Sequence, residues 1–260
     1  SFNSMVRQLK ERIRMKEALD LAMEVQQNLL PQETLKLGDL DIAGKSIYCD
    51  ETGGDYYDFL TFSLKGQKKI GVAVGDVVGH GISAALLMTT VRALLRSRIS
   101  QPGSLSQMVD DVNRLLCQDT SQSGSFMSLF FMLIDIAAEE IQWVRAGHDP
   151  AIIYEPATDS FDELRGEGIV LGVDAQWLYQ DNRHTGLNVG QIILTGTDGI
   201  WETDNPAGEK YGKARLRHTI RQHHRGSAEE ILQAITDALA AFRQTASQDD
   251  DITLVVIKAT

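Results

Sequence analysis

The order of the apolar segments constrains the fold more than any other feature of this sequence. After residue 38 the apolar residues recur with a period of two, the pattern of strands that bury one face. The segments "LDIAGKSIYC" (40–49) and "KIGVAVGDV" (69–77) are therefore predicted to be strands, with a turn at Lys65-Gly66. The spacing predicts a β-rich first unit without an intervening helix.

Two adjacent helices are predicted next, over 82–99 and 104–119, with Ser104 as the N-cap of the second. A hairpin around Ala138-Glu139 follows. The remaining predicted elements are strands near 150–155, 179–187, 191–200 and 251–259, and helices over 213–223 and 227–243. Strands in contiguous runs, rather than alternating with helices, indicate an α+β fold with a largely antiparallel sheet.

Residues 2–30 form a separate unit, predicted to be one helix that Pro31 ends. Its apolar positions follow heptad spacing in two seams, and the register shifts by one step of six between them. The seams are Phe2, Val6, Leu9, Ile13 and then Leu19, Met23, Gln26, Leu30. This pattern favours a parallel dimeric coiled coil over a helix packed on its own domain. We therefore divide the chain into a linker helix, 1–30, and a globular domain, 31–260.

The net charge, the apolar runs and the cysteines indicate which partners and which cellular compartment the chain is suited to. The formal net charge is -11, from 36 acidic and 25 basic residues, which argues against nucleic acid as a partner and is compatible with divalent cations. No apolar run reaches the roughly 18–20 residues that span a bilayer, and no signal peptide opens the chain. The chain starts at Ser1, which indicates a piece of a longer protein, and its two cysteines suit a reducing cytosol.

Four aspartates have settings that suggest more than a turn. Asp76 and Asp198 each end an apolar strand, Asp250 immediately precedes the last strand, and Asp55 follows Gly53-Gly54. A carboxylate at the rim of an apolar sheet is costly unless it is paired or holds a metal. No lysine or arginine adjoins any of the four in sequence. Each alone is more often a turn residue, but together they indicate a metal site.

Oxygen ligands without histidine or cysteine favour Mg²⁺ or Mn²⁺ over zinc. Several carboxylates can hold two such ions about 3.5–4 Å apart, with backbone carbonyls and waters completing the coordination. A water between two ions is acidified enough to attack a phosphoryl group, where catalysis is mostly positioning and charge neutralisation. The pattern therefore indicates phosphoryl hydrolysis.

Five motifs carry a resemblance to a known family. They are "GGDYYDF", "VGDVVGHGISAALLM", "AGHDPAIIY", "TGTDGIWE" and "DDDITLVVI", and "EVQQNLLP" precedes them. Their order resembles the SpoIIE/RsbU-type serine/threonine phosphatases, the bacterial branch of the PPM metal-dependent phosphatases, over about residues 24–259. The resemblance implies a four-layer α/β/β/α sandwich of two mostly antiparallel sheets flanked by helices.

The resemblance also implies site residues and a cofactor of two Mn or Mg ions. Asp76 corresponds to the carboxylate that bridges both ions, and the Val77 carbonyl and Asp55 to ligands of the second ion. Asp198 and Asp250 correspond to ligands of the first. Asp250 aligns best among three consecutive aspartates, and Asp249 and Asp251 stay possible.

The chain departs from the wider PPM pattern in two places. His80 stands four residues after Asp76 rather than two, so the general-acid role of the family histidine is not carried over. No arginine before Asp55 corresponds to the one that grips phosphate in some relatives. We expect His80 to shape the turn into the following helix, and His148 to be a satisfied histidine at a turn. Asp58 is expected to be structural, because odd spacing in a strand turns it away from Asp55.

The first nine residues, "SFNSMVRQL", resemble the end of a HAMP domain. This resemblance implies that the chain is the cytoplasmic output portion of a membrane-anchored receptor. The helix over 2–30 would then be a dimeric transmission rod, with the membrane reached only through an upstream segment.

The predicted function is hydrolysis of phosphoserine or phosphothreonine on a regulatory protein, by family resemblance a STAS-type anti-sigma-factor antagonist. The alternative is a catalytically inactive dimeric pseudophosphatase that acts as a binding module. A diguanylate cyclase is disfavoured, because Tyr56 and Tyr57 follow the "GGD". A nucleotide P-loop is missing, because "GEKYGKA" (208–214) lacks the required spacing.

Overall fold

Two antiparallel sheets stacked face to face form the middle of the molecule. A computed structural model of the chain describes residues 2–50, 52–64, 67–135 and 138–260. Within these residues one sheet has six strands in the order β1-β2-β11-β10-β7-β8, and the other has five in the order β3-β4-β5-β6-β9. Each pairing between neighbouring strands is antiparallel, as expected from the contiguous runs of strand-like sequence.

Most of the expected strand segments coincide with observed strands to within one or two residues at each end, whereas β1 and β8 were not expected. The six-stranded sheet contains β1 (Leu35–Leu37), β2 (Leu40–Ile47), β7 (Ala151–Glu155), β8 (Ser160–Leu164), β10 (Ile192–Gly196) and β11 (Ile252–Ala259). The five-stranded sheet contains β3 (Tyr56–Leu64), β4 (Gln67–Val77), β5 (Met127–Asp135), β6 (Glu140–Ala146) and β9 (Asn182–Thr185). The turn predicted at Lys65-Gly66 lies outside the described residues.

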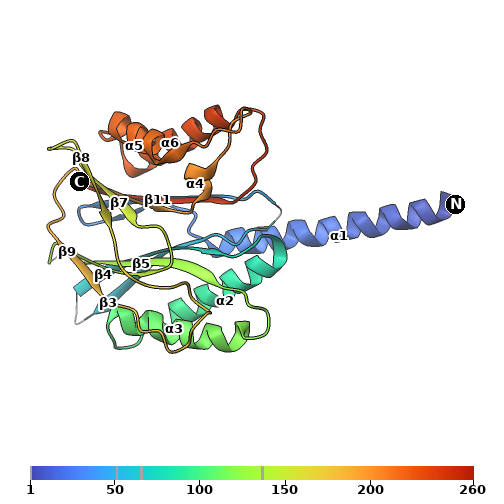
Figure 1. The fold of residues 1–260 in the computed structure, drawn as a ribbon, viewed down its shortest axis with the longest axis horizontal. Coiled ribbons are helices and arrows are strands. Elements are labelled where there is room, and N and C mark those ends of the chain that lie inside the picture. The colour runs from blue at the N-terminus through green and yellow to red at the C-terminus, as the bar shows by residue number, and fades with distance from the viewer. Residues whose placement is uncertain (1, 51, 65–66, 136–137) are drawn as a thin grey trace.

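Helices cover the outer face of each sheet, so the molecule has four layers (Figure 1). The helices α2 (Gly81–Ile99) and α3 (Leu105–Thr120) lie on the five-stranded sheet. The helices α5 (Gly212–His223) and α6 (Ala228–Arg243) lie on the six-stranded sheet, with the short α4 (Gly199–Glu202) beside them. The expected α/β/β/α sandwich is confirmed.

The alternation of β11 shows how one strand serves two cores. Val255 and Ile257 belong to the core that lies between the sheets and continues beneath α2 and α3. Leu254 and Val256 belong to the core beneath α5 and α6. Successive side chains of a strand point to opposite faces, so an uninterrupted apolar run is required wherever both faces are covered.

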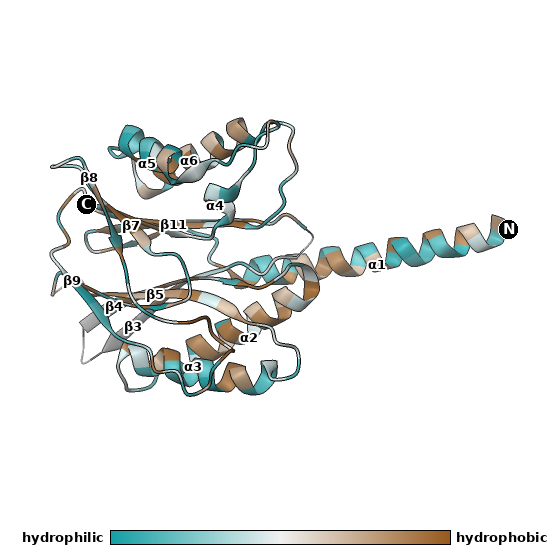
Figure 2. Cartoon of the chain, viewed as in Figure 1, coloured by the Kyte–Doolittle hydropathy of each residue, from teal (hydrophilic) through white to brown (hydrophobic). Residues whose placement is uncertain are grey.

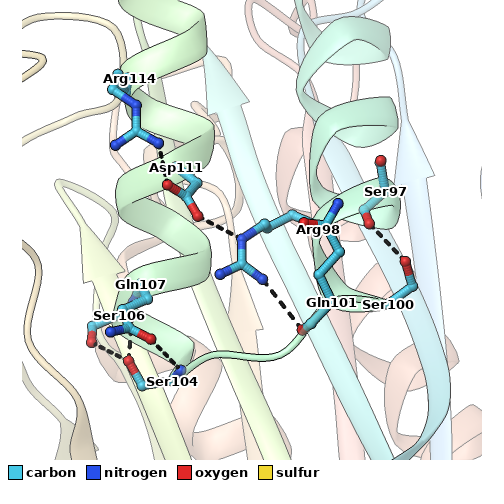
Figure 3. Close-up of polar contacts among 9 residues, drawn as sticks. All are labelled: Ser97, Arg98, Ser100, Gln101, Ser104, Ser106, Gln107, Asp111 and Arg114. Atoms are coloured by element: carbon cyan, nitrogen blue, oxygen red, sulfur yellow. Dashed lines mark hydrogen bonds and ion pairs between the residues drawn. The ribbon is translucent and has the colours of Figure 1, made fainter.

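Polar contacts fix the connection between α2 and α3 (Figure 3). Ser104 Oγ accepts a hydrogen bond from Gln107 N, and Gln107 Oε1 accepts one from Ser104 N at 3.0 Å, which completes a capping box. Arg98 of α2 donates to Asp111 of α3 at 2.6 Å, and Arg114 pairs with the same carboxylate. The two helices that follow the Asp76 loop are therefore tied to each other as well as to the sheet.

The N-terminal helix α1 (Phe2–Leu29) projects away from the sandwich (Figures 1 and 2). The expected helix is confirmed, and Phe2, Leu9 and Ile13 of the first seam are about half or more exposed. The second seam is different, because Gln26 and Leu30 at its end are buried against the chain's own domain. In that last turn the assignment of Gln26 to a coiled-coil seam is wrong, since its side chain binds the globular domain. No helix in the described residues has the length and apolar character needed to cross a bilayer.

The strand predicted near 179–187 is shorter than expected and is confined to β9. Tyr179 N donates to Asp110 of α3, and Asp181 accepts a hydrogen bond from Ser106 N. These contacts with α3 hold residues 179–181 outside the ladder with β6.

Candidate active site

Antiparallel pairing brings the four predicted aspartates to one edge of the sandwich. In the five-stranded sheet Asp55 immediately precedes β3, Tyr56 pairs with Gly75, and Asp76 is the next residue of β4. In the six-stranded sheet Gly196 pairs with Leu254, so Asp198, just after β10, and Asp250, just before β11, lie at the same edge. In an antiparallel pair the end of one strand lies beside the start of its partner. The start of β3 therefore lies beside the end of β4, and the end of β10 beside the start of β11.

Thr197 joins the two sheets at this edge. Its hydroxyl donates to Asp55 Oδ2 at 2.8 Å and accepts from Thr253 N at 3.0 Å. Its own N–H donates to Thr253 O at 2.9 Å. Thr197 is 1% exposed and precedes Asp198 directly. This one residue therefore fixes the distance between Asp55, beside the five-stranded sheet, and Asp198, beside the six-stranded sheet.

The two glycines before Asp55 are required for space. A Cβ at Gly53 would overlap with Asp251 Oδ2 and the Tyr48 ring, and one at Gly54 would lie 2.9 Å from Val77 O. Neither glycine needs a left-handed backbone conformation. The Val77 carbonyl, predicted to be a metal ligand, therefore lies against the residue that precedes Asp55. The pair lets the chain approach both β4 and β11 closely.

The structure distinguishes two of the three consecutive aspartates. Asp251 is 4% exposed, and its two carboxylate oxygens accept hydrogen bonds from Cys49 N and Gly54 N, each at 2.9 Å. Asp250 is exposed, and one of its oxygens accepts from Asp251 N at 2.8 Å. Among the described residues the other oxygen of Asp250 has no hydrogen-bond partner. Asp251 thus uses both carboxylate oxygens to hold the backbone around Gly53 and Gly54, which we call the glycine loop. Asp250 keeps one carboxylate oxygen that could bind an ion.

Burial and mutual repulsion disfavour the charged forms of the carboxylates from the five-stranded sheet. Burial raises the pKa of Asp55 well above its usual range, and the charges of Asp76 and Asp251 add to the rise. Burial also raises the pKa of Asp76 to about 7, with further contributions from Asp198, Asp250 and Asp251. Among the four predicted ligands, Asp76 therefore interacts with predicted ligands of both sheets.

The carboxylates from the six-stranded sheet are affected in the same direction. Burial raises the pKa of Asp198, followed by the charges of Asp250, Glu202 and Asp149. Asp250 is exposed, but the protein around its carboxylate removes part of its hydration and so raises its pKa, and the charge of Asp251 contributes. In the described part of the chain no lysine or arginine side chain pairs with Asp55, Asp76, Asp198 or Asp250.

These donors fit a hard divalent cation in chemistry and charge. A cluster of mutually repelling carboxylates without a cationic side chain is stabilised when an ion supplies positive charge. Within the described residues, no three His, Cys, Asp or Glu side chains by themselves form a group arranged to hold an ion. An ion at this edge would be held by fewer than three of these side chains together with other donors, such as the backbone carbonyl and water that are usual for Mg²⁺.

The two histidines of the motifs have structural surroundings. His148 is buried, and its ring nitrogens contact Ser128 Oγ at 2.8 Å and Gly196 O at 3.1 Å, as expected for a satisfied histidine. Burial lowers the pKa of His148 to about 4, so the ring is neutral near pH 7. His80 lies between Gly79 and Gly81, both with positive φ, and its exposed ring contacts Asp50. The turn leading into α2 accordingly needs glycine on each side of His80.

Asp58 is held apart from the four predicted ligands by its own ion pair. Its carboxylate is completely buried and accepts two hydrogen bonds from Arg96 of α2, each at 2.6 Å, and one from the Tyr56 hydroxyl at 3.1 Å. Arg92 Nε lies 3.8 Å away. The interpretation of Asp58 as structural agrees with these contacts.

Sequence reasoning missed the contacts of three residues that shape the site, although it kept Asp251 as a possible ligand. Thr197 and Asp251 lie inside the recognised motifs, but nothing in their neighbourhood indicates that they bond across sheets. Gln26 donates to Gly53 O at 2.6 Å and accepts from Gly53 N at 3.3 Å. Heptad spacing placed Gln26 in a helix seam, and no further signal in the sequence points to Gly53.

Comparison with known proteins identifies the family to which the chain belongs. The family model of Stage II sporulation protein E (SpoIIE) matches residues 66–260. Phosphoserine phosphatase RsbU of Bacillus subtilis is 30% identical over 246 residues, covering 94% of this chain and 70% of RsbU.

Solved structures share the fold. The SiaA-PP2C domain of Pseudomonas aeruginosa superposes with a TM-score of 0.80 at 23% identity, covering 95% of this chain and 98% of that domain. The RsbU and RsbW domains of Rv1364c from Mycobacterium tuberculosis give a TM-score of 0.67 at 28% identity, covering 84% of this chain and 59% of that chain. This chain spans 41% of Protein IcfG of Synechocystis and 58% of RsbP of Bacillus subtilis, so it matches only part of some relatives. The chain belongs to the SpoIIE family, the SpoIIE/RsbU-type branch of the PPM metal-dependent serine/threonine phosphatases.

Proposed function

We propose that residues 31–260 hydrolyse phosphoserine or phosphothreonine on a regulatory protein with the help of two Mn or Mg ions. The observation that carries this proposal is the convergence of Asp55, Asp76, Asp198 and Asp250 at one edge of both sheets, with their pKa values raised by burial and by one another. A metal-dependent phosphatase needs such a cluster, because it must bind the cations that neutralise the phosphoryl group.

Each residue has a distinct part in this proposal. Asp76 would contact both ions, because its carboxylate interacts with carboxylates of both sheets. Asp55 and the Val77 carbonyl would hold one ion, and Asp198 and Asp250 the other. When bound, the ions lower the pKa of a water and neutralise the phosphoryl oxygens. Thr197 and Asp251 keep the ligands in place through hydrogen bonds.

The test is Mn²⁺-dependent hydrolysis of a phosphoserine protein by Asp76→Asn and Asp198→Asn. We expect each variant to lose at least about 100-fold in activity, because outer residues of metal sites already cost 10–100-fold. Asp119→Asn is the matched control, since Asp119 is an exposed aspartate of α3 away from the site. Normal turnover by a folded Asp76→Asn or Asp198→Asn protein would refute the proposal.

The proposed substrate is a phosphorylated STAS-type anti-sigma-factor antagonist. Support comes from the relatives, which include the phosphoserine phosphatases RsbU and RsbP and a protein that joins RsbU and RsbW domains in one chain. A phosphorylated STAS protein should be hydrolysed with a higher kcat/KM than a phosphoserine peptide of the same local sequence. Equal kcat/KM values for the two would remove the argument for this substrate class.

The proposed context is the cytoplasmic output portion of a membrane-anchored receptor, with residues 1–30 as the end of a HAMP domain and a linker helix. The exposed apolar side chains of α1, among them Phe2, Leu9 and Ile13, support a homodimer through the 2–30 helix. Sedimentation of the chain with and without residues 1–20 tests this pairing. A monomeric full chain at concentrations well above those used in the phosphatase assay would contradict the proposed homodimer.

The alternative is an inactive pseudophosphatase that binds a partner through the same surface. The presence of all four aspartates disfavours this alternative, because a site without metal would gain stability from losing its repelling carboxylates. Calorimetric titration with Mn²⁺ separates the two proposals, since a pseudophosphatase without metal gives no binding heat.

A further inference from the structure

Gln26 of α1 forms two hydrogen bonds with the loop that carries Asp55. It is 4% exposed and is the buried residue of a helix that is otherwise largely open to solvent. Its carboxamide donates to Gly53 O at 2.6 Å and accepts from Gly53 N at 3.3 Å. Both polar groups of one side chain are thus used on one backbone residue.

The opposite side of this loop is held by β11. Gly54 N donates to Asp251 Oδ2, the oxygen against which a Cβ at Gly53 would collide. Gly54 O accepts a hydrogen bond from Val77 N at 3.4 Å. The segment from Gly53 to Asp55 is therefore held between the α1 side chain, the Asp251 carboxylate and the end of β4, with no side chain of its own before Asp55.

We propose that Gln26 is a positioning residue of the metal site, which sets the place of Asp55 and of the Val77 carbonyl by fixing Gly53. This inference rests on the proposed function, because it assigns Gln26 a role toward ions that Asp55 and Val77 would hold. Gln26 itself contacts neither substrate nor ion. Its effect passes along the backbone from Gly53 through Gly54 to Asp55.

The alternative is that Gln26 simply attaches α1 to the domain. Other contacts already do this, since Leu30 is buried in the core and Tyr57 donates its hydroxyl to Pro31 O at 2.6 Å. A side chain needed only for attachment would not have to satisfy both groups of Gly53. The existing anchors also mean that a variant at position 26 should keep α1 docked.

The test compares Gln26→Met with Gln27→Met in the full chain. Methionine has nearly the length and helix propensity of glutamine but leaves the N–H and C=O of Gly53 without their partner. Gln27 is an exposed neighbour, so the same substitution there controls for the change in composition. The readouts are the Kd for Mn²⁺ by calorimetry without substrate, the Mn²⁺ dependence of phosphoserine hydrolysis, and the Tm.

We expect Gln26→Met to bind Mn²⁺ about 10- to 100-fold more weakly, as is typical when a residue that orients a ligand is lost. Its kcat should recover toward the wild-type value at high Mn²⁺ concentration, and Gln27→Met should match the wild type. A Gln26→Met protein with a lower Tm but an unchanged Kd for Mn²⁺ would overturn the inference and leave a purely structural residue.

Two further results keep the test decisive. If Gln26→Met does not fold, Gln26→Glu takes its place, because glutamate keeps the acceptor for Gly53 N and loses the donor to Gly53 O. An unchanged Kd in that variant overturns the inference equally. Failure of the wild-type chain to bind Mn²⁺ or to hydrolyse phosphoserine would instead refute the proposed function, before any variant is compared.

Discussion

Asparagine substitutions in the run Asp249-Asp250-Asp251 should separate stability from catalysis. In Asp251→Asn only one side-chain oxygen is left for two backbone donors, Cys49 N and Gly54 N. The loss of one hydrogen bond to a charged, buried acceptor costs about 1.5–3 kcal/mol. For a chain of this size that corresponds to a fall in Tm of roughly 3–10 °C.

Asp250→Asn should show the opposite pattern. The remaining amide oxygen still accepts from Asp251 N, and the side chain is exposed, so the stability should change by no more than about 0.5 kcal/mol. Loss of a direct ligand should reduce Mn²⁺-dependent hydrolysis more than about 100-fold, whereas Asp251→Asn should lose only about 10-fold.

The assay is thermal unfolding by circular dichroism together with phosphoserine hydrolysis over a range of Mn²⁺ concentrations. Asp119→Asn is the matched control, because Asp119 is an exposed aspartate of α3 away from the site. If Asp250→Asn stayed active while a folded Asp251→Asn lost Mn²⁺ binding, the roles assigned to the two residues would be reversed.

Two further predictions concern buried groups away from the ligands. Arg96→Met should lower the free energy of unfolding in urea by about 3 kcal/mol, because it leaves the fully buried Asp58 carboxylate without its bidentate partner. As a control, Arg114→Met removes one member of an exposed ion pair and should lower it by under about 1 kcal/mol. Equal losses in the two variants would contradict the reasoning. Between pH 6.5 and 4 the unfolded chain protonates His148 while the folded chain does not. The free energy of unfolding therefore decreases as the pH is lowered, by about 3 kcal/mol for a pKa lowered to about 4. His148→Gln should lack this component of the slope, and parallel pH curves for the two proteins would show that burial does not hold the ring neutral.

Local periodicity was sufficient to predict an α+β fold and the strand ends at which Asp76 and Asp198 stand, whereas the four layers were implied by the family resemblance. Contiguous strand-like runs predict antiparallel sheets, and the places of Asp76 and Asp198 at strand ends follow from where the apolar runs stop. Pairing of β3 with β4, and of β10 with β11, then brings those ends together. These inferences succeed because each depends on local periodicity, which a single sequence contains.

Contacts between distant segments could not be predicted in the same way. Three consecutive aspartates are equivalent in sequence until β2 and the glycine loop supply the two N–H groups that occupy Asp251. Gln26 fits a heptad seam equally well whether it faces a partner helix or Gly53. Asp58 and Arg96 are 38 residues apart, and no local pattern links them. In each case the deciding partner comes from another element of the fold.

The edge at which the four aspartates meet is therefore a property of the stacked sheets rather than of one loop. Asp55 and Asp76 belong to one sheet, and Asp198 and Asp250 to the other, so a relative shift of the sheets would separate the two pairs. Two buried residues oppose that shift: Thr197 bonds Asp55 from the six-stranded sheet, and His148 lies between Ser128 and Gly196. Neither would bind an ion, yet both act where β10 ends and the ligands begin. Because these ties leave the glycine loop itself to Gln26 and Asp251, the separation of the sheets and the position of Asp55 are controlled by different contacts.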